Sequence, residues 1–145
     1  MCSKARKEAR DRLKAEFGQY LHIKRERAQI ARLIAELDGT LAAPGTSKWD
    51  SMPRGGGAGD PITGGLIRKE QLIERYRRKD EELAAELTRI EAMWEILAPR
   101  ERELMRYRYV DGKDWVSVCV AIGYEWSQTH RIHNGALDKL IAAGA

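Results

Sequence analysis

Apolar residues recur at helical spacing in two long stretches of the chain. In the first, they stand three and four residues apart from residue 13 to residue 37, interrupted only by Arg27. In the second, the same spacing runs from residue 73 to residue 97, interrupted only by Asp80. Such spacing puts side chains on one face of an α-helix, and that face must be buried against another surface. The seam positions are Leu13, Phe17, Tyr20, Ile23, Ile30, Ile34 and Leu37, then Ile73, Tyr76, Leu83, Leu87, Ile90, Trp94 and Leu97.

Glycine and proline divide the chain between these two seams. Residues 38–65 contain three of the four prolines and most of the glycines, whereas residues 66–98 contain neither residue type. Such punctuation predicts a helix, a loop over 38–65 and a second helix. Trp49 and Met52 lie in the loop. They could dock on the helices or on a partner, or the loop could be a flexible connector.

The two seams fit together if the helices run antiparallel with Arg27 opposite Asp80. In that register, the apolar positions from Leu13 to Ile34 meet apolar positions on the second helix. A polar pair in an apolar seam commonly fixes the register, at some cost in stability. The alternative is that Arg27 and Asp80 each reach water at the edge of the seam.

A compact segment follows Pro99, and its local signals predict three further helices. Pro99 suits a first helical turn, and Asp111-Gly112 ends that helix. Asp114 is a good N-cap for a short helix over 115–122, and Gly123 suits a tight turn before a last helix over about 126–142. The residues expected inside are Leu104, Tyr107, Val110, Trp115, Val118, Cys119, Ile122, Ile132, Ala136, Leu137 and Leu140. A short helix, a glycine turn and a longer helix are typical of a helix-turn-helix.

Three short motifs stand in the same segment: RYVDG at residues 108–112, VCVAIG at 118–123 and ALDKL at 136–140. Through these motifs the segment resembles region 4 of the sigma-70 type RNA polymerase sigma factors. The whole layout, with the loop motif SMPRGGG at 51–57, resembles the phage-encoded ArpU-type and RinA-type late-gene regulators of Gram-positive hosts. The resemblance implies a DNA-binding regulator. The chain departs from the sigma pattern at Glu125, Trp126, Ser127 and Thr129.

Base readout in the major groove needs polar side chains on one face of the first turns of a helix. Ser127, His130, Arg131 and Asn134 have that spacing in the last helix. Arg131 can bond bidentately to guanine and Asn134 to adenine. The full set of expected DNA contacts is Trp126, Ser127, Gln128, His130, Arg131, Asn134 and, for a phosphate, Lys113. Arg106 and Arg108 are further phosphate candidates, and His133 is expected to be an ordinary surface residue.

Charge and composition limit the function classes. The net charge is +4, and residues 1–37 carry 10 Lys/Arg against 5 Asp/Glu, which permits a nucleic-acid partner. No apolar run is long enough for a transmembrane helix, so no membrane partner is expected. Cys2 and Cys119 are too few for a disulfide framework, and no His/Cys/carboxylate group has metal-ligand spacing. Gly55-Gly56-Gly57 lacks the Lys-Ser/Thr of a phosphate loop. We therefore expect no enzyme, no cofactor and no metal, and a location in the bacterial cytoplasm.

These observations predict an all-α chain. Residues 1–98 would form a long, coiled-coil-like antiparallel hairpin, and residues 99–145 a sigma-region-4-like helix-turn-helix domain. The expected function is DNA-binding transcription regulation of the phage or prophage type, with double-stranded DNA as partner. Two alternatives stay open: a small-terminase-like packaging or assembly oligomer, and an adaptor that binds host RNA polymerase with little DNA affinity. A homo-oligomer joined through the hairpin is possible: a dimer would support the regulator, a ring of many subunits the packaging protein, and a monomer that binds host polymerase the adaptor.

Overall fold

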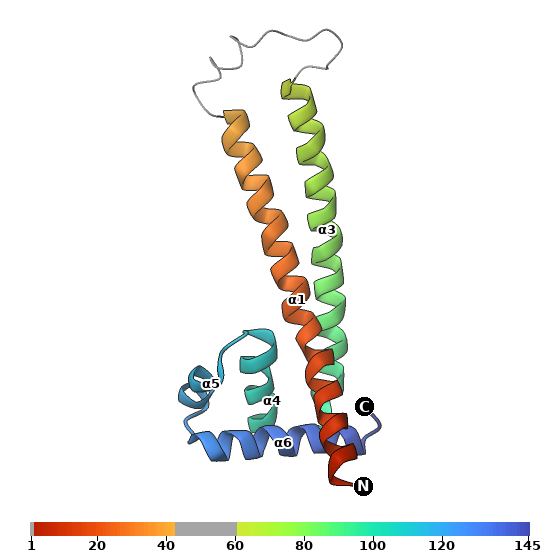
Figure 1. The fold of residues 1–145 in the computed structure, drawn as a ribbon, viewed down its shortest axis with the longest axis vertical. Helices are drawn as coiled ribbons and strands as arrows, with labels where there is room; N and C mark the ends of the chain where they lie inside the picture. The colour runs from red at the N-terminus through yellow and green to blue at the C-terminus, as the bar shows by residue number, and fades with distance from the viewer. Residues whose placement is uncertain (1, 43–60) are drawn as a thin grey trace. The chain divides into compact units, whose positions relative to one another are not determined.

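The computed structural model describes residues 2–42 and 61–145, which form helices and short connections, with no strand among them. Its elements are α1 (Ser3–Ala42), α3 (Pro61–Met93), a 3-10 turn (Trp94–Ile96), α4 (Pro99–Met105), a π-helical turn (Arg106–Val110), α5 (Trp115–Ile122) and α6 (Trp126–Ala142) (Figure 1). None of the described helices combines the length and the apolar composition that crossing a bilayer requires. Trp49, Met52 and the 51–57 motif lie outside the described residues.

The loop predicted over 38–65 is too long at both ends. Helix α1 continues to Ala42, where the Thr40 hydroxyl donates to the Glu36 carbonyl at 3.0 Å. Helix α3 already begins at Pro61. A single glycine costs a helix only about 1 kcal/mol, so Gly39 does not end α1. Proline is favoured in a first helical turn, so Pro61 begins a helix here and does not prevent one.

The described residues divide into two compact units. The two-helix unit comprises residues 24–42 of α1 and 61–81 of α3, and the larger unit comprises residues 2–23 and 82–145. The core of the larger unit therefore joins side chains from both sides of residue 98, where the sequence predicts a domain boundary.

In the two-helix unit, α1 and α3 run antiparallel, and the predicted pairing of Arg27 with Asp80 is confirmed. The Arg27 Nη1 atom lies 2.5 Å from Asp80 Oδ1, and Lys69 Nζ lies 2.6 Å from Asp38 Oδ1. The side chains of Arg27 and Asp80 are 27% and 57% exposed, so the pair lies at the wet edge of the seam. The pair therefore forms as predicted, but at the seam edge, where both side chains also reach water.

The seam predicted for α3 is wrong at its N-terminal end. Leu72 is 2% exposed, whereas Ile73 is 47% exposed. Lys79 is half-buried and pairs with Glu26 at 3.0 Å, whereas Asp80 is exposed. Counting back from Leu83 by four and then three residues reaches Tyr76 through Lys79, and a further four reaches Leu72. The spacing through Asp80 also reaches Tyr76. From Tyr76, a step of three reaches Ile73 and a step of four reaches Leu72, and the structure buries Leu72.

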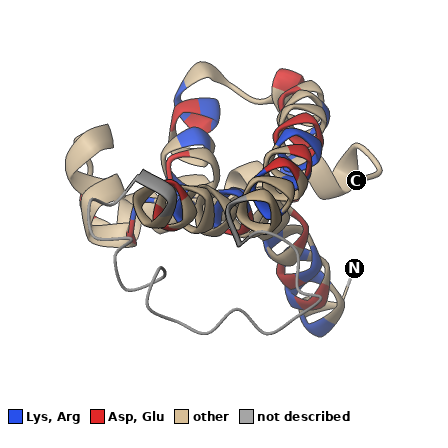
Figure 2. Cartoon of the chain, turned by 90° about the horizontal axis from the view of Figure 1, so that it is seen from above, with Lys and Arg blue, Asp and Glu red and all other residues tan. Residues whose placement is uncertain are grey.

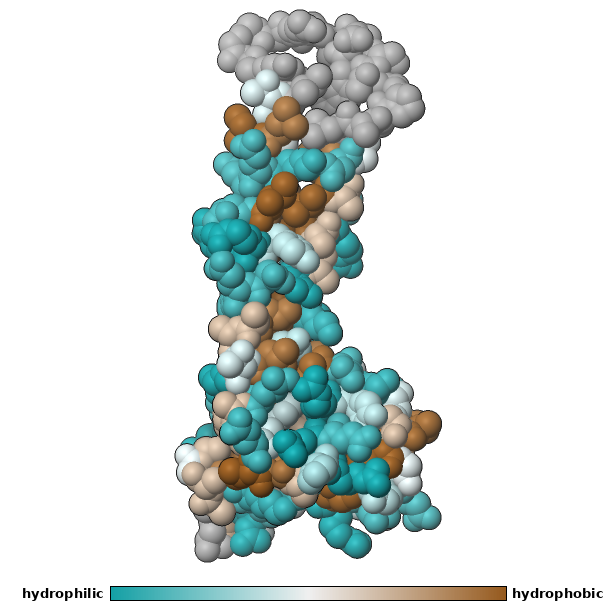
Figure 3. All heavy atoms as spheres, turned by 180° about the vertical axis from the view of Figure 1, so that it is seen from behind, coloured by the Kyte–Doolittle hydropathy of each residue, from teal (hydrophilic) through white to brown (hydrophobic). Residues whose placement is uncertain are grey.

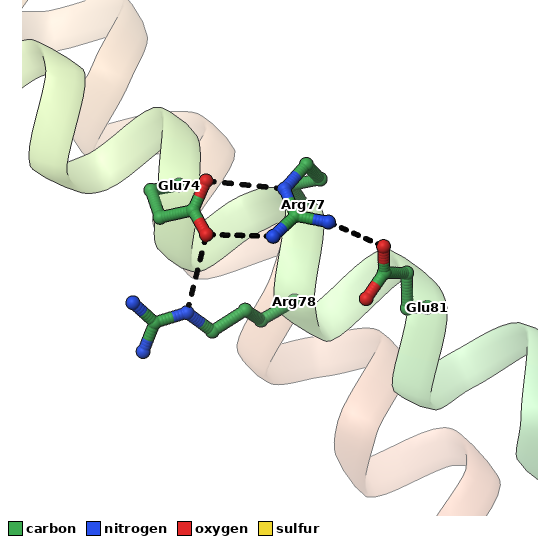
Figure 4. A network of polar contacts seen from close by, with 4 residues as sticks. All are labelled: Glu74, Arg77, Arg78 and Glu81. Carbon is green, nitrogen blue, oxygen red and sulfur yellow. Dashed lines mark hydrogen bonds and ion pairs between the residues drawn. The ribbon is translucent and has the colours of Figure 1, made fainter.

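The outer face of α3 carries a network of alternating charges. The Glu74 carboxylate accepts hydrogen bonds from Arg77 at 2.7 and 3.1 Å and from Arg78 at 3.4 Å, and Arg77 also pairs with Glu81 (Figure 4). The hydrogen bonds from Arg77 lower the pKa of Glu74 to about 2. Both signs of charge recur along the long helices, whereas α5 carries no charged residue (Figure 2). Glu74 and Glu81 therefore offset part of the positive charge of Arg77 and Arg78 on this face.

The larger unit holds a continuous apolar core. Phe17 is fully buried, with its ring centroid 5.5 Å from those of Trp94 and Tyr109. Further buried members are Leu13, Tyr20, Ile23, Leu83, Ile90, Leu97, Leu104, Met105, Val110, Val118, Ile122, Ala136, Leu137 and Leu140. Helices α4, α5 and α6 thus share one core with the N-terminal part of α1 and the end of α3 (Figure 1). This core fixes the position of α6, on which most of the predicted site residues lie.

Candidate nucleic-acid interface

The short helix α5 begins at the predicted cap. The Ser117 backbone N–H donates to Asp114 Oδ1 at 2.8 Å, and this bond, with others from Ser117, lowers the pKa of Asp114. Helix α5 spans Trp115–Ile122, as predicted, and buries Val118 and Ile122 fully. Trp115 and Cys119 are only half-buried. The cap and the two buried side chains together fix the helix on the core.

A left-handed glycine joins α5 to α6. Gly123 has a φ of 77°, and its N–H donates to the Cys119 carbonyl at 2.9 Å. Glycine adopts this conformation without the steric cost that a Cβ atom brings. Helix α6 then begins at Trp126, with Glu125 at the N-cap position making no side-chain capping bond. The turn and the helix bounds agree with the prediction.

The buried face of α6 differs from the predicted one in two polar residues. Thr129 is 0% exposed and His133 is 1% exposed, beside the expected Ala136, Leu137 and Leu140. Ile132, expected inside, is only half-buried. The prediction that His133 is a surface residue is wrong, because its position four residues after Thr129 and three before Ala136 belongs to the buried stripe. The same spacing in the sequence could have placed both residues inside.

A hydrogen bond compensates for the burial of His133. The Tyr109 hydroxyl and His133 Nε2 lie 2.8 Å apart, and the two rings are stacked with centroids at 5.8 Å. Burial, followed by the positive charge of Lys14, lowers the pKa of His133 to about 3. Burial also raises the pKa of Tyr109 to about 12. Both groups are therefore neutral at pH 7, and His133 is a core residue.

Four of the predicted contact residues lie at the surface of the first turns of α6. Ser127, Gln128 and Arg131 are exposed, and Trp126 is 55% exposed. Arg131 lies on the side of the helix opposite its buried stripe. This region therefore presents hydroxyl, amide, guanidinium and indole groups to solvent.

His130 and Asn134 are half-buried, which separates them from that exposed set. The His130 ring centroid lies 4.4 Å from that of Trp115 and 4.5 Å from that of Trp126. Its Nε2 atom is buried and finds no hydrogen-bond partner among the described residues. Burial, with the nearby charges of Lys14 and Arg108, lowers the pKa of His130. The His130 ring therefore packs against the rings of Trp115 and Trp126 and is only partly exposed to solvent.

The predicted phosphate contacts precede α5 and pack against aromatic rings. Lys113 is half-buried, with Nζ 5.9 Å from the Tyr107 ring centroid. Arg108 donates to the Lys113 carbonyl at 3.0 Å, and its guanidinium carbon lies 4.8 Å from the Trp115 ring centroid. Arg106 pairs with Glu91 at 2.5 Å, which neutralises its charge locally. Lys113 and Arg108 are therefore the better placed of these three cations.

The basic start of α1 packs beside α6, which the sequence did not indicate. Arg10 forms a bidentate pair with Asp138, with bonds of 2.8 and 2.6 Å. These bonds hold the N-terminal part of α1 on the C-terminal half of α6. The positive charge of Lys14 acts on both His130 and His133. The excess of Lys and Arg in residues 1–37 was visible in the sequence, but the face against which it packs was not.

Comparisons with protein-family models, with curated proteins and with solved structures found no match. Within residues 2–42 and 61–145, no three His, Cys, Asp or Glu side chains are grouped so that they could hold a metal ion. The features that bear on function are therefore the residues of the larger unit described above.

Proposed function

We propose that this chain is a DNA-binding transcription regulator of the phage or prophage type, acting in the cytoplasm of a bacterial host. In this proposal, α1 and α3 form a long coiled-coil-like hairpin, and residues 99–145 form a sigma-region-4-like helix-turn-helix. Helix α5 is the positioning helix and α6 is the recognition helix. The partner is double-stranded DNA read in the major groove.

The observation that carries the proposal is the arrangement from Asp114 to α6. A capped eight-residue helix, a left-handed Gly123 and a 17-residue helix follow one another, and both helices pack on one core. This order of elements is the signature of DNA-reading helix-turn-helix units, whose second helix enters the major groove with its first turns. The exposed polar side chains of α6 lie in those first turns, as such a role requires.

The exposed residues would have two roles, which are contact with base edges and contact with the phosphate backbone. Arg131 is exposed opposite the buried stripe and would bond bidentately to guanine. Ser127 and Gln128 would bond to neighbouring base edges. Lys113 and Arg108 would contact phosphates, which set affinity and register without reading sequence.

Selection of bound DNA from a random double-stranded library tests this function. The purified full chain should enrich one sequence motif, and affinity for it should fall steeply as salt rises. A matched control is Arg78→Ala, because Arg78 lies in the two-helix unit, outside the proposed recognition helix, and should leave the motif unchanged. If the library shows no enrichment and affinity does not depend on salt, the regulator proposal fails.

A second candidate is a protein adaptor that binds host RNA polymerase, and one observation favours it. Val116 and Val120 of α5 are 65% and 78% exposed, and α5 carries no charge. An exposed apolar helix face suits contact with protein better than contact with phosphates. Binding of purified bacterial RNA polymerase by the wild type, lost in Val120→Lys, together with no DNA enrichment, would favour the adaptor.

The packaging alternative differs in oligomer size. A small-terminase-like ring needs many copies of the chain, whereas a regulator with a two-fold DNA site needs a dimer. The two-helix unit exposes four large apolar side chains, which are Leu33, Leu66, Ile67 and Ile73. Figure 3 shows hydrophobic residues among hydrophilic ones on one face. The two-helix unit therefore has apolar surface for contacts between copies of the chain. Sedimentation of the full chain therefore accompanies the DNA selection, and a ring of many subunits would favour packaging.

A further inference from the structure

We infer that Trp126 reads the C5-methyl group of a thymine in the major groove, an inference that rests on the proposed function. The starting observation is that a large apolar ring stands exposed in the first turn of α6. Trp126 is 55% exposed, whereas Trp94 is 1% exposed in the core. An exposed tryptophan in a small unit with a well-filled core calls for a role outside that core.

Neighbouring rings hold Trp126 in place. Its ring centroid lies 4.5 Å from that of His130, at an interplanar angle of 53°, and the His130 ring lies 4.4 Å from that of Trp115. The Arg108 guanidinium packs on Trp115 in turn. Because these contacts restrict the indole before any partner arrives, little side-chain entropy is lost on binding.

The chemistry of the indole selects the base feature that it can read. Tryptophan has one N–H donor and no acceptor, so it cannot form the bidentate bonds by which Arg, Asn or Gln recognise guanine or adenine. Its face offers apolar contact. In the major groove, the apolar feature that distinguishes the four bases is the thymine methyl group.

Position along α6 gives the expected place of this thymine. Trp126 precedes Arg131 by five residues, which is about 7.5 Å along a helix that rises ~1.5 Å per residue. Bases along one strand are ~3.4 Å apart. Residues five apart also point about 140° away from one another around the helix. The thymine read by Trp126 should therefore lie within a few base pairs of the guanine read by Arg131, at a different base pair.

Replacing thymine by deoxyuridine tests the inference, because it removes only the methyl group. In the selected site, each thymine is replaced singly, and the affinity of the wild-type chain is measured. One replacement should weaken binding about fourfold, the value expected for losing the burial of one methyl group. Trp126→Ala should bind the thymine and deoxyuridine forms of that position equally, whereas Trp126→Phe should keep a preference for thymine.

Arg131→Ala is the matched control from the same helix. It should keep the fourfold thymine preference while losing preference at the guanine. Circular dichroism of each variant checks that the helices are kept. If the wild type binds its site but tolerates deoxyuridine everywhere, or if Trp126→Ala keeps the thymine preference, the inference is wrong and the proposed function stands. If the wild type binds no DNA, the inference and the proposed function fail together.

Discussion

His133 places an ionisable ring inside the core of the larger unit. We expected this residue at the surface because histidine is polar, although its spacing from Thr129 and Ala136 fits the buried stripe of α6. Its hydrogen bond to Tyr109 satisfies Nε2, and surrounding apolar side chains exclude water. Burying a neutral imidazole with a partner costs little, whereas burying an imidazolium costs several kcal/mol. The protonation of this residue is therefore linked to the stability of the fold.

This linkage predicts that the free energy of unfolding falls as the pH is lowered from 7 to 5. The unfolded chain has a histidine pKa of about 6.5, whereas the folded chain holds the pKa of His133 at about 3. Between these values only the unfolded state takes up the proton, so lowering the pH stabilises the unfolded state. The expected loss is about 2 kcal/mol. Urea unfolding at the two pH values measures it.

His133→Gln supplies the comparison for the pH experiment, because glutamine can bond to Tyr109 but does not titrate. In this variant the fall between pH 7 and pH 5 should be much smaller. His22→Asn is the control, because His22 is exposed on α1. An equal fall in His133→Gln and in the wild type would show that the buried histidine is not the source.

Two glycines of the larger unit should respond in opposite ways to alanine. Gly123 has a φ of 77°, and a Cβ atom there would meet nothing within 4 Å, so the cost of Gly123→Ala is purely conformational. We expect a loss of about 1 kcal/mol. Gly135 lies inside α6 with equally open surroundings, so Gly135→Ala should gain about 0.5–1 kcal/mol. Thermal unfolding of the two variants measures both changes in stability. If both variants gain stability or both lose it, the left-handed turn assigned to Gly123 is contradicted.

At the scale of elements, the helix bounds predicted from the sequence were most accurate where a single residue marks the start or the end of a helix. Asp114 and Gly123 define the bounds of α5, and Pro99 begins α4. The ends of α1 and α3 near the predicted loop were missed, because glycine and proline weaken or start helices without forbidding them. The π-helical turn at Arg106–Val110 follows no pattern that we found in the sequence.

The candidate site was predictable only in part, for a related reason. Helical spacing identified Ser127 and Arg131 as surface residues of α6, and both are exposed. The half-buried position of His130 depends on Trp115 and Trp126, which come from two helices. Contacts between elements such as this one, or the pair of Arg10 with Asp138, depend on packing that a one-dimensional pattern does not contain.

The Arg27–Asp80 pair gives a test at the element scale. The pair is formed at the seam edge, with side chains 27% and 57% exposed. Exposed ion pairs contribute roughly 0.2–1 kcal/mol, so each alanine variant should cost less than about 1 kcal/mol, with a coupling energy in that range. A double-mutant cycle in urea provides the measurement. A coupling energy above about 2 kcal/mol would mean that the pair is buried after all.

At the scale of the whole molecule, the groups of the candidate interface lie in the larger unit. On α3 of the two-helix unit, Arg77 is paired with Glu74 and Glu81. In the larger unit, the exposed Arg131 and the cations Lys14, Arg108 and Lys113 lie on or near α6 and the start of α5. Sequence-specific DNA binding needs both kinds of group, one for bases and one for phosphates. In the proposed function, Arg131 would be the first kind of group and Lys113 the second.

The most direct test of the proposed function is the affinity of three proteins for a selected site and for scrambled DNA at two salt concentrations. Wild type should prefer the selected site. Arg131→Ala should lose about 1–3 kcal/mol of that preference, as for a bidentate arginine–guanine contact. Lys113→Ala should weaken binding to both DNAs about equally and reduce the dependence on salt. If wild type and Arg131→Ala bind the two DNAs with equal affinity, α6 does not read DNA and the regulator proposal is contradicted.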